Sequence, residues 1–175
     1  MKKGALFAAL ASTYVLAACQ TTLPYVEGTN TQPLAVNLSD AEWDGQTVIK
    51  RHICTRYGGT DPHSPAMSVK GIPAQATHIY VSFNDKSYKP MDNGGHGGLL
   101  FKIAPGAKEA TLPAVPTGTT GLPDGVSIKT TSYKAPCSGG RGNLYTADVF
   151  AIADPESPDS QGTIVAKGNV TLGNY

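Results

Sequence analysis

One histidine stands out among the groups that could do chemistry, because glycines flank it on both sides. His96 lies in the segment 92–98, DNGGHGG, directly before an apolar run at 99–101. Glycine has no Cβ, so the backbone can approach this imidazole closely on both sides. An imidazole held in this way can donate a hydrogen bond to an anion or a carbonyl. The competing interpretation is an exposed histidine at the tip of a hairpin.

A second glycine-rich segment, PCSGGRGN at 136–143, carries potential anion ligands. Successive backbone N–H groups in such a turn can form a concave nest for an anion, and the Arg141 guanidinium can donate two parallel hydrogen bonds. The alternative is a solvated loop whose shape is set by a disulfide. Ser138 lies in the same segment but lacks the Gly-x-Ser-x-Gly pattern of a nucleophile elbow. We therefore expect that the protein is not an enzyme. Enzymatic turnover that is lost on Ser138→Ala would instead favour a hydrolase.

The spacing of the histidines gives little support to a metal site. His52, His63, His78 and His96 form no His-x-x-x-His pair, and no Cys-x-x-Cys pair accompanies them. We expect no metal and no cofactor. His52 follows a basic residue and His78 begins an alternating segment on its polar side, so both are expected at the surface.

The N-terminus has the layout of a secretory signal. Lys2 and Lys3 precede a mostly apolar run at 5–18 that is too short and too small in side chain to cross a hydrocarbon core of ~30 Å. The string Leu-Ala-Ala-Cys resembles a bacterial lipoprotein signal, in which Cys19 is acylated, for example with palmitate, and becomes the first mature residue. The alternative is an ordinary signal peptide with a chance cysteine.

This resemblance implies removal of residues 1–18 and a lipid anchor at Cys19. Two or three acyl chains, at ~0.8 kcal/mol for each buried CH2 group, hold a domain on a membrane more stably than one chain does. Gln20, in place of an aspartate, favours the outer membrane, facing the periplasm. The expected localisation is therefore the bacterial cell envelope.

The composition of the mature chain limits its partners. Removing residues 1–18 leaves 157 residues, enough for one domain with a core, and leaves 12 basic against 13 acidic residues once Lys2 and Lys3 are gone. No basic tail argues for nucleic acid, and no second apolar run argues for a membrane span. Cys54 and Cys137 are left after Cys19, and in an oxidising periplasm we expect them to bond. Two buried free thiols are the alternative.

Alternating apolar residues predict an all-β protein with at most a few short helices. Strands are predicted over the four segments 78–84, 99–103, 144–152 and 163–172. The pattern is weaker at 47–53 and 67–70. The chain has 20 glycines and 13 prolines, which favours short strands joined by turns in a β-sandwich. We expect residues 19–37 to be a lipidated tether and residues 38–175 to be the single folded domain.

Three segments are too long and too rich in glycine and proline for simple hairpins, namely 55–66, 85–98 and 105–143. Long ordered loops on a β scaffold are where binding sites tend to lie. These loops are therefore expected to position the site.

Taken in order, several segments resemble the phosphatidylethanolamine-binding protein family, which includes the Raf kinase inhibitor proteins and their bacterial relatives. Residues 56–65 are similar to its Gly-x-Asn-x-Ser-Pro turn, and residues 69–77 to its Trp-x-x-x-Pro-x-x-Thr step. Gly95-His96 resembles the pocket His-Trp. Residues 135–140 resemble Gly-Pro-Cys-Pro-Pro-x-Gly, and the closing segment 162–175 ends in the family's Gly-x-Tyr.

The resemblance implies a β-sandwich with a small anion pocket. The ligand-binding residues carried over by position are Asp85, His96, Pro136, Gly139, Asn143 and Tyr145. The family's Asp-Pro-Asp-x-Pro loop has become 84–90, which keeps one acid, Asp85, followed by Lys86. A second pocket histidine is replaced by Asn143, whose amide donates at any pH. We expect a less acidic pocket, and complete loss of the pocket is the alternative.

Two classes of function follow. The first is non-enzymatic binding of a small anionic or polar ligand by a membrane-anchored lipoprotein. The second is a protein-interaction or inhibitor scaffold that uses exposed loop residues, with Tyr88, Leu122 and Tyr133 as candidates, to bind an envelope protein. A common cleft lined by Asp85, His96 and Asn143 would favour the first.

Overall fold

The structure is a computed structural model that describes residues 23–154 and 162–175. The signal segment 1–18 and the proposed lipidation site Cys19 lie outside these ranges. Within them the chain forms β1 Val26–Pro33, β2 Ala35–Leu38, β3 Met67–Lys70, β4 His78–Asp85, β5 Gly97–Lys102, β6 Glu109–Leu112, β7 Val126–Ile128, β8 Leu144–Ala153 and β9 Thr163–Asn174. The helical elements described are single 3-10 turns: η1 Lys50–His52, η2 Thr55–Tyr57 and η3 Lys89–Met91. The predicted all-β class is confirmed.

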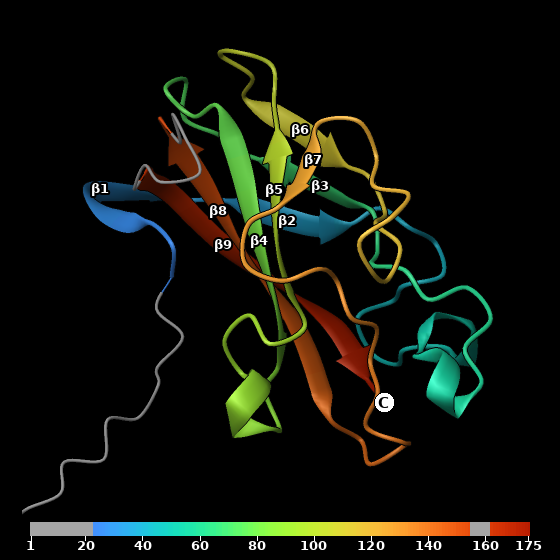
Figure 1. The fold of residues 1–175 in the computed structure, drawn as a ribbon. Helices are drawn as coiled ribbons and strands as arrows, with labels where there is room; N and C mark the ends of the chain where they lie inside the picture. The colour runs from blue at the N-terminus through green and yellow to red at the C-terminus, as the bar shows by residue number, and fades with distance from the viewer. Residues whose placement is uncertain (1–22, 155–161) are drawn as a thin grey trace, which may run out of the picture.

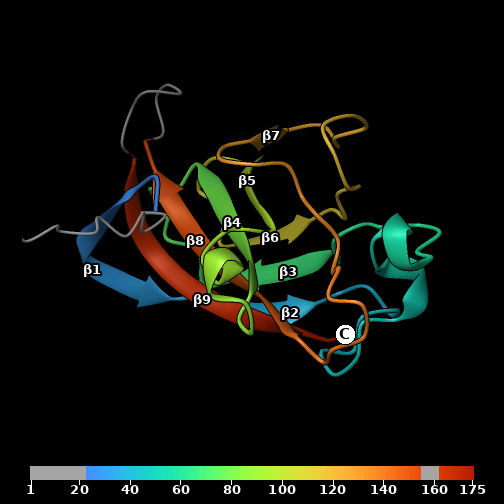
Figure 2. The same cartoon turned by 60° about the horizontal axis from the view of Figure 1, so that its bottom comes forward.

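The strands form two sheets. The larger has the order β1-β9-β8-β4-β5-β7, and the smaller has the order β2-β3-β6. β1 runs parallel to β9, whereas the other neighbours in both sheets are antiparallel. Figure 1 shows the small sheet behind β4 and β5, with β2 crossing them steeply. Figure 2 shows the long strand β9 bending around the body of the molecule.

The main core lies between the two sheets. Ile79, Val81 and Phe83 of β4 share one face, as their alternation predicts. They belong to the same buried cluster as Met67 and Val69 of β3. Each such side chain contributes roughly 1.5–3 kcal/mol when it is fully buried. The predicted strands 78–84, 99–103, 144–152 and 163–172 correspond to β4, β5, β8 and β9.

The opposite face of the large sheet is also covered. Tyr80, Phe150 and Ile152 pack there with Tyr25, which precedes β1. The rings of Tyr25 and Tyr80 meet edge to face with centroids 5.2 Å apart. β8 is therefore buried on both faces, as its nearly continuous apolar sequence predicts.

The prediction that residues 19–37 form a tether is wrong for the second half of this segment. β1 pairs with β9, and the chain then passes through buried Leu34 into β2 of the other sheet. Pro33 and the threonines make this segment look like a linker, but an edge strand tolerates proline. Its partner β9 lies more than a hundred residues away, so local composition does not reveal the pairing. The folded unit begins before Leu38.

Two further expectations about strands need correction. Residues 47–53 form no strand: Thr47 makes an isolated bridge to Asn174, and η1 follows. The segment 105–143, expected to be loop, contributes β6 and β7. Both are very short, so their alternation is too brief to detect. The weaker expectation at 67–70 is confirmed by β3.

The early start of the fold predicts a large effect of truncation. A chain that begins at Leu38 loses β1 and the buried side chains of Tyr25 and Leu34, so its free energy of unfolding should fall by about 3–6 kcal/mol. Urea denaturation checks this against a matched chain that begins at Leu23. Equal unfolding midpoints would show that β1 adds nothing to stability.

Candidate ligand-binding site

Strand pairing brings the predicted site residues together at one end of the large sheet. Asp85 is the last residue of β4 and pairs with Tyr145 of β8. Asn143 directly precedes β8, and His96 directly precedes β5, where its backbone N–H donates to the Phe83 carbonyl at 3.0 Å. These side chains line one pocket of about 540 Å³; its polar lining includes Asp85, His96, Lys134, Arg141, Asn143 and Tyr145. Four residues predicted from distant segments therefore share a cleft.

The carboxylate of Asp85 is buried but hydrogen-bonded. Asp85 is only 3% exposed. Oδ2 accepts from Nδ2 of Asn143 at 2.7 Å, and Oδ1 accepts from the backbone N–H of Ser87 at 3.0 Å. Hydrogen bonds to an ionised acceptor are stronger than neutral ones, so this pair fixes the orientation of the Asn143 amide.

His96 has one defined tautomer in its neutral form. Its Nδ1 lies 2.8 Å from the carbonyl oxygen of Lys134, and a carbonyl only accepts, so Nδ1 carries the proton and donates. Nε2 is then the ring nitrogen that can accept from a ligand. Burial is the main cause that lowers the pKa of His96, and the Lys134 ammonium adds to it, whereas the Lys134 carbonyl and Asp85 oppose it. His96 is therefore mainly neutral at pH 7.

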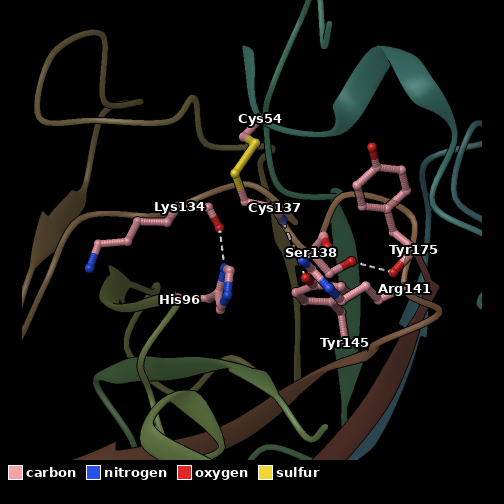
Figure 3. Close-up of a disulfide and its surroundings, with 8 residues drawn as sticks. All are labelled: Cys54, His96, Lys134, Cys137, Ser138, Arg141, Tyr145 and Tyr175. Carbon is pink, nitrogen blue, oxygen red and sulfur yellow. Dashed lines mark hydrogen bonds between the residues drawn. A yellow bond between two sulfur atoms is a disulfide. The ribbon is translucent and has the colours of Figure 1, made fainter. Parts of the chain in front are cut away.

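Tyr145 and Ser138 close the pocket on the side of the chain's end (Figure 3). The ring of Tyr145 meets His96 edge to face, with centroids 5.1 Å apart, and its hydroxyl accepts from the Cys137 N–H at 3.2 Å. Burial raises the pKa of Tyr145. The Ser138 hydroxyl donates to the main-chain oxygen of Tyr175. This serine is thus used in holding the turn to the last residue.

A disulfide joins the two loops that flank the pocket. Cys54 and Cys137 are bonded, with their Cα atoms 5.2 Å apart, and both line the pocket. Beside the disulfide, the Cys54 N–H donates to the Pro136 carbonyl at 2.9 Å. Figure 3 shows the bond above His96 and Tyr145. The disulfide therefore holds the loop after η1 against the glycine-rich turn.

Two residues carried over by resemblance do not line this pocket. Pro136 is buried, and its carbonyl accepts from the Cys54 N–H. Gly139 faces Tyr57, since a Cβ added to it would lie 2.9 Å from the Tyr57 Cζ, and its φ of +71° favours glycine. Both residues shape the turn. The consecutive glycines hide this, because a sequence cannot say which side of a turn faces the pocket.

The cations of the pocket also differ from expectation. The Lys86 ammonium donates to the Asp92 carbonyl at 2.8 Å, outside the pocket lining. Lys134 and Arg141 belong to the lining instead, but the Lys134 ammonium is directed to the Gly95 carbonyl at 3.5 Å and runs away from Arg141 (Figure 3). Arg141 is therefore the cation of the lining that stands against the one carboxylate of Asp85. Arg141 is visible in the sequence as part of the glycine-rich turn. Lys134 has no such signal, because it reaches His96 only through tertiary pairing.

Two histidines outside the pocket differ from the surface positions expected for them. His52 is fully buried, with its ring centroid 4.1 Å from that of His63. His78 is half-buried, and burial lowers its pKa. The basic neighbour of His52 suggested a solvated turn, but a 3-10 turn directs adjacent side chains to different sides.

Comparisons with known proteins reveal the fold. No protein-family model matches the chain, and no curated protein sequence matches it. Among solved structures it is similar to E. coli YbcL, described as a new member of the mammalian PEBP family, with a TM-score of 0.58 and 18% identity over 81% of this chain and 97% of that chain. A phosphatidylethanolamine-binding protein homologue from Chlamydia trachomatis matches with a TM-score of 0.47 and 17% identity over 83% and 98%. The chain has a phosphatidylethanolamine-binding-protein-like fold, as the resemblance of its motifs indicated.

The environment of His96 predicts an acidic titration. Its folded pKa lies below the usual 6.5, so an NMR titration of the ring should show a midpoint below that value. The unfolded chain then takes up this proton first, and stability is lost as pH falls below about 6.5. His96→Asn should reduce the stability lost on acidification, measured by urea denaturation at neutral and acidic pH. A midpoint at or above 6.5 contradicts this prediction.

The disulfide is expected to raise the free energy of unfolding. It closes a sequence separation of 83 residues, so the Cys54→Ala/Cys137→Ala variant should lose about 2–4 kcal/mol of unfolding free energy, measured in urea. Reduced wild-type protein is the matched control, because it separates loss of the bond from loss of the sulfur atoms. Equal unfolding midpoints of the variant and the oxidised wild-type protein would contradict this prediction.

Proposed function

We propose that this protein is a non-enzymatic, lipid-anchored protein of the bacterial envelope that binds a small anionic or polar ligand in the pocket beside His96. The observation that carries this proposal is the convergence of Asp85, His96 and Asn143 on one pocket whose lining also includes Lys134 and Arg141. Residues from well-separated parts of the chain meet there.

The balance of charge supports an anionic group as the ligand. Arg141 is a cation of the lining, and the charge of its one carboxylate, Asp85, is already engaged by Asn143 and Ser87. A guanidinium binds carboxylate or phosphate with paired hydrogen bonds, so Arg141 is the main anion ligand of the proposal. His96 Nε2 would accept from a hydroxyl or ammonium group of the same ligand.

The hydrogen bonds of Ser138 support binding rather than hydrolysis. Its hydroxyl donates to the main chain at Tyr175, and its carbonyl accepts from Arg141. A serine nucleophile instead needs its hydroxyl to donate to a general base. We therefore retain non-enzymatic binding as the proposal.

The proposed anchor would hold the domain close to the bilayer. No helix among the described residues is long and apolar enough to cross a membrane. Tyr25 already belongs to the buried cluster on the outer face of the large sheet. Six residues at ~3.5 Å each reach from Cys19 to Tyr25, about 20 Å in all. An acylated Cys19 would therefore keep the domain near the membrane surface.

The alternative, a protein-interaction scaffold, keeps one supporting residue. Tyr88 is 53% exposed at the edge of the pocket. Tyr133, expected on an exposed loop, is instead buried at 1%, and Leu122 packs against the core. If Tyr88→Ser abolishes capture of an envelope protein while small-ligand binding is absent, the scaffold is favoured.

Calorimetry tests the binding proposal. Titration of the mature chain with inorganic phosphate, phosphoethanolamine and acetate should give heat with at least one of them. Arg141→Gln should weaken that binding about 10-fold or more, because a charge-assisted hydrogen bond contributes roughly 1.5–3 kcal/mol. Lys86→Gln is the matched control, since this cation points to Asp92. No heat with any ligand, or equal loss in both variants, would refute the proposal.

A further inference from the structure

Two histidines and a glutamate form a second cluster of potential ligands. Glu42, His52 and His63 each offer one ligand atom, and the three atoms lie within 4.8 Å of one another. None of these residues lines the pocket beside His96. The intervals between them match no sequence motif, so the cluster exists only in the folded chain.

Backbone carbonyls fix the tautomer of both imidazoles. His52 Nδ1 lies 2.9 Å from the Asp61 carbonyl oxygen, and His63 Nδ1 lies 2.8 Å from the Ser64 carbonyl oxygen. A carbonyl only accepts, so each Nδ1 carries a proton and donates it. Metal-binding histidines are typically oriented in this way, with one ring nitrogen donating to a carbonyl and the other left as ligand.

Each Nε2 faces a carboxylate. His52 Nε2 lies 2.9 Å from Glu42 Oε2, and His63 Nε2 lies 3.6 Å from Asp61 Oδ2. In a neutral imidazole with Nδ1 protonated, Nε2 carries a lone pair. A lone pair and a carboxylate oxygen at this distance repel each other, so the His52–Glu42 contact requires a cation between them, either a proton or a metal ion.

The geometry points to a metal ion, and we propose that Glu42, His52 and His63 form a binding site for a divalent transition-metal ion, with Zn²⁺ as its probe. Two imidazole nitrogens and one carboxylate oxygen are a ligand set that Zn²⁺ takes in proteins. A proton would satisfy His52 alone, whereas a metal ion also uses the lone pair of His63. Tetrahedral coordination at ~2.0–2.1 Å needs ligand atoms about 3.3 Å apart. His63 lies at the partly exposed edge of the cluster, so it is the ligand that can move to reach this spacing.

Surrounding charges hold the carboxylates in place. Arg51 donates to Glu42 Oε1 at 3.2 Å and to Asp61 Oδ2 at 2.7 Å, which leaves Glu42 Oε2 for the metal. With neutral histidines, the two carboxylates and Arg51 sum to one negative charge. That charge favours a cation, and Asp61 can supply a fourth ligand in place of water.

The chain contains its own reporter for this site. Trp43 stacks on His52 with ring centroids 5.4 Å apart and an interplanar angle of 10°. It is the only tryptophan of the protein. A paramagnetic ion such as Cu²⁺ bound at His52 should quench its fluorescence, and Zn²⁺ should compete with that quenching. Divalent copper also binds nitrogen ligands more tightly than zinc does.

The experiment uses the untagged mature chain, stripped with a chelator, with Cys19 acylated or replaced by serine so that no thiol competes. We expect one Zn²⁺ per chain by calorimetry and quenching of Trp43 by Cu²⁺. His63→Ala and Glu42→Gln should each weaken Zn²⁺ binding at least 10-fold. His78→Gln and His96→Ala are the matched controls and should leave it unchanged.

Three results would overturn the proposal: no Zn²⁺ binding with no quenching, binding that survives both ligand variants, or equal loss in the controls. If a ligand variant does not fold, nitrogen NMR of the wild-type histidines decides instead. Zn²⁺ should then shift Nε2 of His52 and His63 together. A wild-type His52 that is protonated on both nitrogens and unaffected by Zn²⁺ would show that the cation is a proton.

Discussion

The disulfide between Cys54 and Cys137 is the covalent constraint that links the two candidate sites. It joins two loops that run outside the sheets, and the adjacent bond from the Cys54 N–H to the Pro136 carbonyl aligns their backbones. On one side of this link lies the pocket beside His96. On the other, Cys54 follows η1, which carries His52 into its cluster. One covalent bond thus links the glycine-rich turn beside the pocket to the segment that carries His52.

The polar groups of the pocket are hydrogen-bonded to other groups of the protein. Asp85 is held by Asn143, His96 by the Lys134 carbonyl, and Tyr145 by the Cys137 N–H. Buried polar groups with fixed partners need little reordering on binding, which reduces the entropic cost of association. Asn143, which the resemblance aligns with a histidine, still supplies a hydrogen-bond donor to Asp85. It replaces a titrating ring with an amide donor that orients the single remaining carboxylate.

Alternation made the strands inside the large sheet predictable, because β4 and β8 are long and bury one or both faces. β1 was missed because its partner β9 is distant and its composition is that of a linker, and β7 is too short to alternate visibly. The resemblance located Asp85, His96, Asn143 and Tyr145 correctly in one pocket. Lys134 could not be found, because its contact with His96 is made by its backbone.

By itself the sequence determined the faces of the strands and the two cysteines available to pair, because side-chain period and cysteine number are local or countable properties. Only the tertiary structure decided which side of the glycine turn faces the pocket, where Lys86 points, and that His52 meets His63. These are contacts between loops, whose directions depend on the sheets and the disulfide that close them. No periodic pattern encodes them, so they follow from the position of the whole backbone.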